Sequence, residues 1–284
     1  IKPDDAKAHS DLGLNYGILD RHQDAVEAYK QAVRIKPDDA KAHSDLGLNY
    51  GILDRHQDAV EAYKQAVRIK PDDAKAHSDL GLNYGMLGRY QDAIEACKQA
   101  IRIKPDLAEA HYFLGLTYGI LGRHQDAIEA YKQAVRIKPD FAEAHCNLGV
   151  TYGELGRHQD AIEAYKQAIR IKPDLAEAHN GLGNAYKNLD RYQDAVEAYK
   201  QAIRIKPDFA EAHNNLGNAY GELDRYKDAV EAYKQAIRIK LDDTEAHSNL
   251  GNAYKDLNRY QDAVEAYKQA IRIKPDDAKA HSNL

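Results

Sequence analysis

The side chains best suited to metal binding or proton transfer in this sequence are histidines that recur every 34 residues. They are His9, His43, His77, His111, His145, His179, His213, His247 and His281. Imidazole is a common zinc ligand, but a zinc site on a helix needs a second ligand three or four residues away. No second ligand recurs with every histidine at that spacing. We therefore expect these histidines to pack at the start of a helix.

Other motifs that could carry chemistry are weak. Cys97 and Cys146 have no partner at metal-ligand spacing. Gly181-Leu182-Gly183 begins like a dinucleotide fingerprint, but Tyr186 stands where the third glycine is needed. The sequence has no P-loop, no Gly-x-Ser-x-Gly and no His-Glu-x-x-His motif. It therefore predicts no catalytic residues, no cofactor and no metal, and the chain is not expected to be an enzyme.

Charge and hydropathy limit the partners. The net charge of -5 disfavours a general nucleic-acid binder, because phosphate contacts require clustered positive charge. Mean hydropathy is -0.72, and no apolar run approaches the roughly 18 residues of a membrane span. We expect neither nucleic acid nor membrane as a partner. With no recognisable signal peptide, the compartment stays undetermined and the cytoplasm is the default.

The whole sequence is periodic. The run Ile-Lys-Pro-Asp returns every 34 residues from Ile1, with Leu241 in place of one proline. Residues 1–34 and 35–68 are identical. Eight full units and 12 further residues account for the chain, so residues 1–284 are predicted to form a single array without recognisable caps.

Each unit predicts two helices. Asp4 and Asp5 can cap the first helix, whose apolar face follows at helical spacing: Ala8, Leu12, Tyr16 and Leu19. Asp20 or an equivalent Gly, Asp or Asn suits the left-handed conformation that ends a helix. A second apolar stripe ends before Pro37 and comprises Ala25, Val26, Tyr29, Ala32 and Val33. Gly13 and its copies should mark a close helix crossing, with the small Ala25 as its partner.

The recurring Leu12, Gly13, Tyr16, Ala25, Tyr29, Ala32 and Pro37 resemble the signature of the tetratricopeptide repeat (TPR) family. The resemblance implies an all-α, right-handed superhelical solenoid of helix-turn-helix repeats, in which the first helix of each repeat lines a concave groove. It also implies a protein–protein interaction scaffold. Two departures are visible, since His9 stands where the family often has tryptophan and Leu241 replaces a proline.

The groove is where the units differ. In the fourth unit Tyr112, Phe113 and Leu116 form an apolar patch, which either anchors a partner or fills space between helices. From the fifth unit onward the groove is rich in asparagine, at Asn147, Asn180, Asn184, Asn214, Asn215, Asn218, Asn249 and Asn252. Amides can donate to and accept from a peptide main chain. This run resembles the asparagine ladder of the O-linked N-acetylglucosamine transferases, which implies recognition of an extended peptide.

We therefore expect an interaction scaffold that binds an extended peptide or disordered segment in the groove. Two alternatives remain open: a structural spacer or self-assembling array, natural or engineered, and the substrate-selecting arm of an enzyme. The uncapped terminal units predict possible end-to-end self-association. Lys187 and Lys255 are the basic residues deep in the asparagine-rich half, and they suggest selection of an acidic side chain.

Overall fold

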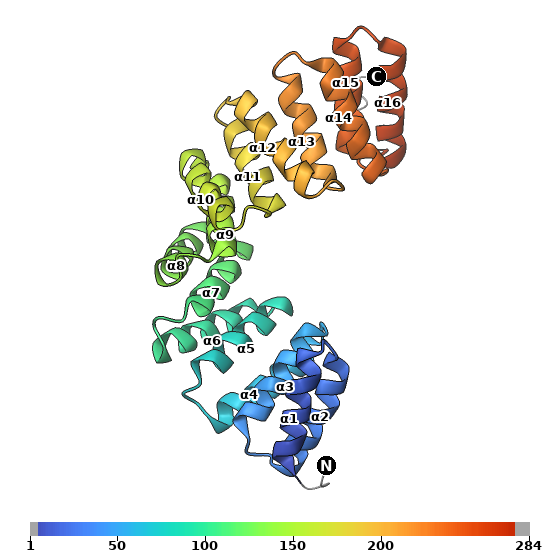
Figure 1. Ribbon diagram of the computed structural model, residues 1–284. Coiled ribbons are helices and arrows are strands. Elements are labelled where there is room, and N and C mark those ends of the chain that lie inside the picture. Colours follow the sequence, from blue (N-terminus) through green and yellow to red (C-terminus); the bar gives the residue numbers. More distant parts are fainter. Residues whose placement is uncertain (1–4, 276–284) are drawn as a thin grey trace. The chain divides into compact units, whose positions relative to one another are not determined.

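The computed structural model describes residues 5–275, in which sixteen α-helices and no strand are found. The helices form two compact units, Ile1–Asp140 and Phe141–Leu284. Figure 1 labels the helices of both units. Unit 1 contains α1 (Ala6–Ile18), α2 (His22–Ile35), α3 (Ala40–Ile52), α4 (His56–Ile69), α5 (Ala74–Met86), α6 (Tyr90–Ile103), α7 (Ala108–Ile120) and α8 (His124–Ile137). Unit 2 contains α9 (Ala142–Glu154), α10 (His158–Ile171), α11 (Ala176–Lys187), α12 (Tyr192–Ile205), α13 (Ala210–Gly221), α14 (Tyr226–Ile239), α15 (Thr244–Asp256) and α16 (Tyr260–Ile273).

Each repeat turns between its two helices through one left-handed residue, as the sequence predicts. The φ angle of this residue lies between 54° and 72° in all eight repeats, at Asp20, Asp54, Gly88, Gly122, Gly156, Asp190, Asp224 and Asn258. The next residue is an arginine whose guanidinium lies 4.3–4.5 Å from the ring centroid of the preceding tyrosine, as for Arg21 over Tyr16. The same arginine pairs with an aspartate on the second helix. The turn is therefore the same in both units.

The first helices begin in two ways. The Asp5 carboxylate accepts a hydrogen bond from the Ala8 amide at 2.9 Å, which confirms the predicted cap, and the equivalent aspartates do the same in α3, α5 and α15. In α7, α9, α11 and α13 the cap residue is Leu or Phe and makes no side-chain cap bond. These helices therefore begin after a half-buried apolar residue in place of a polar cap.

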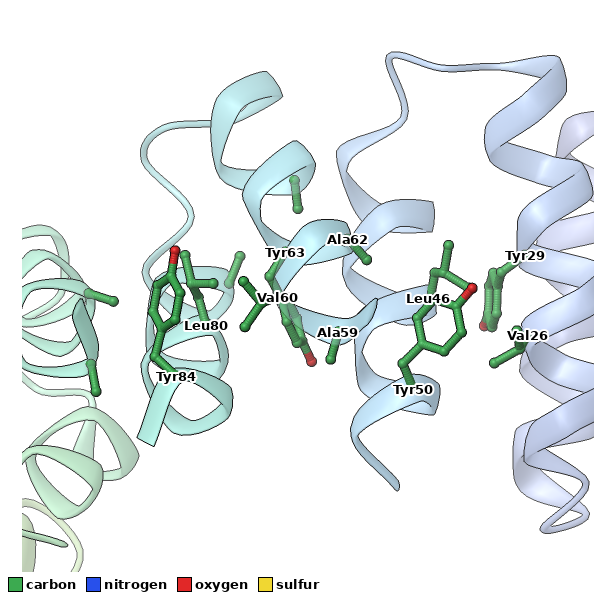
Figure 2. Close-up of a cluster of buried hydrophobic side chains, with 14 of the residues drawn as sticks. Val26, Tyr29, Leu46, Tyr50, Ala59, Val60, Ala62, Tyr63, Leu80 and Tyr84 are labelled. Atoms are coloured by element: carbon green, nitrogen blue, oxygen red, sulfur yellow. The ribbon is translucent and has the colours of Figure 1, made fainter. Parts of the chain in front are cut away.

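The two helices of a repeat cross at the recurring glycine of the first helix, the equivalent of Gly13. A Cβ on Gly47 would lie 2.8 Å from the Tyr63 ring, so only glycine fits under that ring. The close crossing is confirmed, and the nearest atoms belong to the tyrosine ring of the second helix; in the third repeat, where Cys97 replaces the tyrosine, they include the carbonyl oxygen of Ala93, the equivalent of Ala59. Figure 2 shows Tyr63, Val60 and Leu80 in the resulting core of unit 1.

The burial of a repeat depends on its neighbour. Repeats 1 and 2 have identical sequences, yet Leu46 and Tyr50 are buried whereas Leu12 and Tyr16 are only half-buried. The difference arises because the second repeat packs between neighbours on both sides, through α2 and α5. Stability is therefore shared between repeats and the interfaces that join them.

The periodic histidines tie each first helix to the linker before it. The Nε2 atoms of His43 and His77 lie 3.0 Å from the carbonyl oxygens of Pro37 and Pro71, and later repeats show the same bond. A carbonyl oxygen only accepts, so Nε2 must carry the proton. Within residues 5–275 no cluster of histidine, cysteine, aspartate or glutamate could hold a metal. No described helix has the length and apolar character to cross a membrane.

Candidate ligand-binding grooves

The two units carry different side chains at the same two places on their first helices. We call these the groove positions, namely the residues equivalent to Leu14 and Ile18. Unit 1 has the pairs Leu14/Ile18, Leu48/Ile52, Leu82/Met86 and Leu116/Ile120. Unit 2 has the pairs Val150/Glu154, Asn184/Asn188, Asn218/Glu222 and Asn252/Asp256. The groove is thus apolar in unit 1 and mostly amide and acidic in unit 2.

The unit 1 groove contains an open apolar pocket of about 320 Å³. Leu48, Ile52, Leu82 and Met86 line it together with the ring of Tyr63. Ile52 is 49% exposed and Met86 is 60% exposed, which are large values for such side chains. The groove positions of unit 1 therefore form an exposed apolar stripe.

The predicted anchor Tyr112, Phe113 and Leu116 lies on α7 of the same unit, and all three side chains are half-buried. The Tyr112 ring centroid lies 5.6 Å from that of Phe113 and 6.0 Å from that of Tyr131 on α8. Part of this aromatic surface is therefore used for packing within the repeat. The remaining exposed part extends the apolar stripe.

In unit 2 three asparagines at the groove positions are held by tyrosines of their own repeats. The hydroxyls of Tyr199, Tyr233 and Tyr267 donate to the Oδ1 atoms of Asn184, Asn218 and Asn252 at 2.7, 2.8 and 2.6 Å. A hydroxyl that donates to Oδ1 fixes which end of the amide is the acceptor. Each of the three amides is thereby oriented by its own second helix.

Other predicted asparagines join neighbouring repeats. Asn180 and Asn214 are buried, and their Nδ2 atoms donate to Glu211 and Glu245 of the next repeat. Asn215 donates to Asn180 at 3.2 Å. These side chains already use hydrogen-bonding capacity in the repeat interfaces, so they support the groove from beneath.

Asn249 and Asn147 complete the predicted set. Asn249 donates to Asn218 at 3.1 Å and to Asn214 at 3.3 Å, and so links the eighth repeat to the seventh. Asn147 is half-buried on α9, and its backbone carbonyl accepts from the Thr151 hydroxyl. Only Asn184, Asn218 and Asn252 of the set occupy groove positions.

Two pockets follow the unit 2 groove. One of about 430 Å³ is lined by Asn180, Asn184 and Asn188 with Glu154, Glu177 and Glu211. The other, of about 560 Å³, contains both Asn218 and Asn252. It is also lined by Tyr192, Tyr226 and Asp190, which come from second helices and turns and which the sequence reasoning missed. The sequence signal that could have indicated these residues is the tyrosine that the sixth to eighth units carry at the position equivalent to His56.

Comparison with known families finds matches that together cover residues 18–284. The model described as the cilia and flagella-associated protein 70 C-terminal domain, a TPR domain, matches residues 107–284, which is more than half of the chain. Tetratricopeptide repeat models match residues 72–140, 18–51 and 52–88. The chain is a tetratricopeptide-repeat protein. No curated protein matches it significantly over its sequence.

Solved structures agree with this assignment to the TPR family. The crystal structure of MamA is 32% identical, with a TM-score of 0.55 over 58% of this chain and 97% of MamA. A chain of the APC/C hetero-tetramer Cut9-Hcn1 is 19% identical, with a TM-score of 0.67 over 93% of this chain. This TPR protein spans about half, 52%, of that chain. The fold is the superhelical TPR solenoid.

TPR proteins are in general non-catalytic scaffolds, and protein–protein interaction is the function that the family assignment supports. The partners of such repeats are proteins or peptides. The groove positions are among the places where this TPR protein departs from a uniform repeat, so they are candidate determinants of its specificity.

Proposed function

We propose that the protein binds an extended peptide or disordered segment along the first helices of unit 2. The observation that carries the proposal is the row of oriented amides at Asn184, Asn218 and Asn252, one in each of three consecutive repeats. An extended main chain also presents a regular series of donors and acceptors, which amides can match without reading side chains.

The surroundings of these amides support the proposal. Asn218 and Asn252 line the 560 Å³ pocket, and Asn184 lines the 430 Å³ pocket. The tyrosine hydroxyls hold the amides in place before a ligand arrives, which lowers the entropy lost on binding. Among solved TPR structures, YrrB is described as having an unusual peptide-binding site, and it is 20% identical over 66% of this chain with a TM-score of 0.58.

The test uses substitutions that the fold already accepts. Leucine occupies the equivalent position in each of the first four repeats. In the second repeat, for example, this leucine is Leu48 and the equivalent tyrosine is Tyr63. The triple variant Asn184→Leu, Asn218→Leu, Asn252→Leu therefore removes the amides with little change in helix packing. Short random peptides are selected on the parent protein, and the affinities of enriched peptides are measured on parent and variant.

We expect the variant to bind these peptides at least tenfold more weakly, which is about 1.4 kcal/mol. The control is Leu14→Asn, which adds an amide at the equivalent position of unit 1 and should leave peptide affinity unchanged. Failure of any peptide to enrich, or equal binding by the triple variant, would reject the unit 2 groove as the binding site and favour the spacer reading.

A further inference from the structure

The pocket of about 560 Å³ in unit 2 combines features that each favour a positive charge. It is lined by three carboxylates, Asp190, Glu222 and Asp256, against one ammonium, Lys187. Tyr192, Tyr226 and Tyr233 also line it. The faces of aromatic rings attract cations by about 0.5–2 kcal/mol.

Three helices also end at this pocket. Lys187, Gly221 and Asp256 are the last residues of α11, α13 and α15, and all of them line it. The carboxyl end of a helix carries partial negative charge from its unsatisfied carbonyl groups. The negative charge of these three helix ends and of the carboxylates exceeds the positive charge of the single ammonium of Lys187.

The hydroxyls of Tyr192 and Tyr226 stay protonated to a higher pH than that of an isolated tyrosine. The Tyr192 hydroxyl donates to Asp190 at 2.7 Å, and the Tyr226 hydroxyl donates to Asp224 at 2.6 Å. These bonds raise the pKa of each tyrosine to about 12, since the neighbouring carboxylate favours the neutral hydroxyl. Each hydroxyl proton is therefore used by an aspartate, while the hydroxyl oxygen can still accept a hydrogen bond from a cationic ligand.

We infer that this pocket takes a lysine or arginine side chain, so that the segment bound in unit 2 is basic. The inference rests on the proposed peptide binding and names its specificity. A bare metal ion is not the occupant that the geometry suits, because no three histidine, cysteine, aspartate or glutamate side chains in residues 5–275 come close enough to hold one. An ammonium or guanidinium group on a peptide needs only nearby negative charge and an aromatic wall.

Unit 1 lacks this combination at the equivalent place. Ile52 and Met86 stand where unit 2 has Glu222 and Asp256, and His56 stands in place of a tyrosine. The sequence-based hypothesis that Lys187 and Lys255 select an acidic side chain is also less favoured. Lys187 is outnumbered in the pocket that it lines, and Lys255 is not among the lining residues.

The experiment compares two random-peptide libraries on the intact protein, identical except that one lacks lysine and arginine. The charge variant is Glu222→Gln with Asp256→Asn, which keeps side-chain size and polarity while removing two charges. Lys187→Gln is the matched variant of opposite sign. Thermal unfolding of all three proteins confirms that they fold.

We expect enrichment mainly from the library with basic residues, at least tenfold weaker binding by the charge variant, and tighter binding by Lys187→Gln. Binding should also weaken as ionic strength rises from about 0.05 to about 0.5 M, because salt screens the attraction.

The outcomes separate the two claims. Equal enrichment from both libraries, with binding still lost in the asparagine-to-leucine variant, would refute the basic specificity and leave peptide binding standing. Basic peptides that bind the charge variant as well as the parent would also refute it. No enrichment from either library would overturn peptide binding itself, and the charge inference with it.

Discussion

Units 1 and 2 share one helical frame but present different chemistry at the groove positions. The left-handed turn, the arginine over the tyrosine and the glycine under the tyrosine ring recur in both. Leu48 and Ile52 of unit 1 nevertheless correspond to Asn218 and Glu222 of unit 2. The comparison teaches that packing constrains the residues beneath the groove while its surface can change from apolar to acidic.

The largest effect on stability should come from the shared frame. Gly47→Ala and Gly217→Ala place a Cβ 2.8 Å and 2.5 Å from the rings of Tyr63 and Tyr233. Overpacking of this kind costs about 1–3 kcal/mol, so both variants should unfold at clearly lower urea concentration, by similar amounts. Gly153→Ala, where no atom lies within 4 Å, is the control and should be stabilising by about 0.5–1 kcal/mol. A large effect in one unit alone would show that the frames are not equivalent.

Exchanging the groove surface should change ligand chemistry without unfolding the protein. The variant Leu48→Asn, Ile52→Glu, Leu82→Asn, Met86→Glu gives unit 1 the groove residues of unit 2. We expect it to bind less of the uncharged apolar dye Nile red, because two of the four apolar groove pairs of unit 1 are removed. Circular dichroism should report unchanged helix content. Undiminished dye fluorescence would place the apolar binding surface elsewhere.

A smaller effect is expected where the first helices start differently. The Asp73 carboxylate accepts from the Ala76 amide at 3.1 Å, whereas α11 starts at Leu175 without a side-chain cap. Asp73→Ala should therefore cost about 1 kcal/mol, and Asp73→Asn, which can still cap, should cost little. Urea unfolding distinguishes them. Equal losses of unfolding free energy in the two variants would mean that the charge of Asp73 is responsible, and not its capping hydrogen bond.

The smallest effect on stability is expected at alkaline pH. The pKa of Tyr192 and of Tyr226 is raised to about 12 in the folded protein, above the ordinary value near 10. Their contribution to stability is therefore complete below about pH 10 and is lost as the pH rises through about 12. Tyr192→His and Tyr226→His, which adopt the residue type of His56, should remove two groups from the last phase of a phenolate absorbance titration.

Burial also raises the pKa of Tyr29 in unit 1 to about 12, so a late phase should persist in the double variant. Disappearance of the whole late phase would mean that Tyr192 and Tyr226 alone produce it.

The fold follows from the sequence because the apolar helix stripes and the left-handed turn residue recur in all eight repeats. The stop after Ile35, the left-handed Asp20 and the cap at Asp5 are local effects of residue type, and all three are confirmed. The close crossing at Gly13 is confirmed; the atoms nearest to its Cβ position belong to the Tyr29 ring, and in the third repeat, where Cys97 replaces the tyrosine, they include the backbone of Ala93, the equivalent of Ala25. Which of two residues on a second helix reaches the first depends on side-chain length and packing, and spacing alone leaves that open.

The candidate site could be predicted only in part. Asn180 and Asn184 lie four residues apart on one helical face, so spacing assigns both to the groove. In the structure both line the 430 Å³ pocket, but Asn180 is buried and donates to Glu211 of the next repeat, whereas Asn184 accepts from Tyr199 of its own repeat. The pocket around Tyr192 joins residues from several helices and turns, and only the packed repeats bring these together.

The identity of residues 1–34 and 35–68 has a consequence for how such a protein can change. Any interface between two repeats is built from the same positions, so a further copy of the 34-residue unit inserted between them would meet compatible surfaces on both sides. Recombination within the gene can therefore lengthen or shorten the protein in steps of one unit, while point substitution alters one groove position at a time. Length and specificity are in this sense separately adjustable.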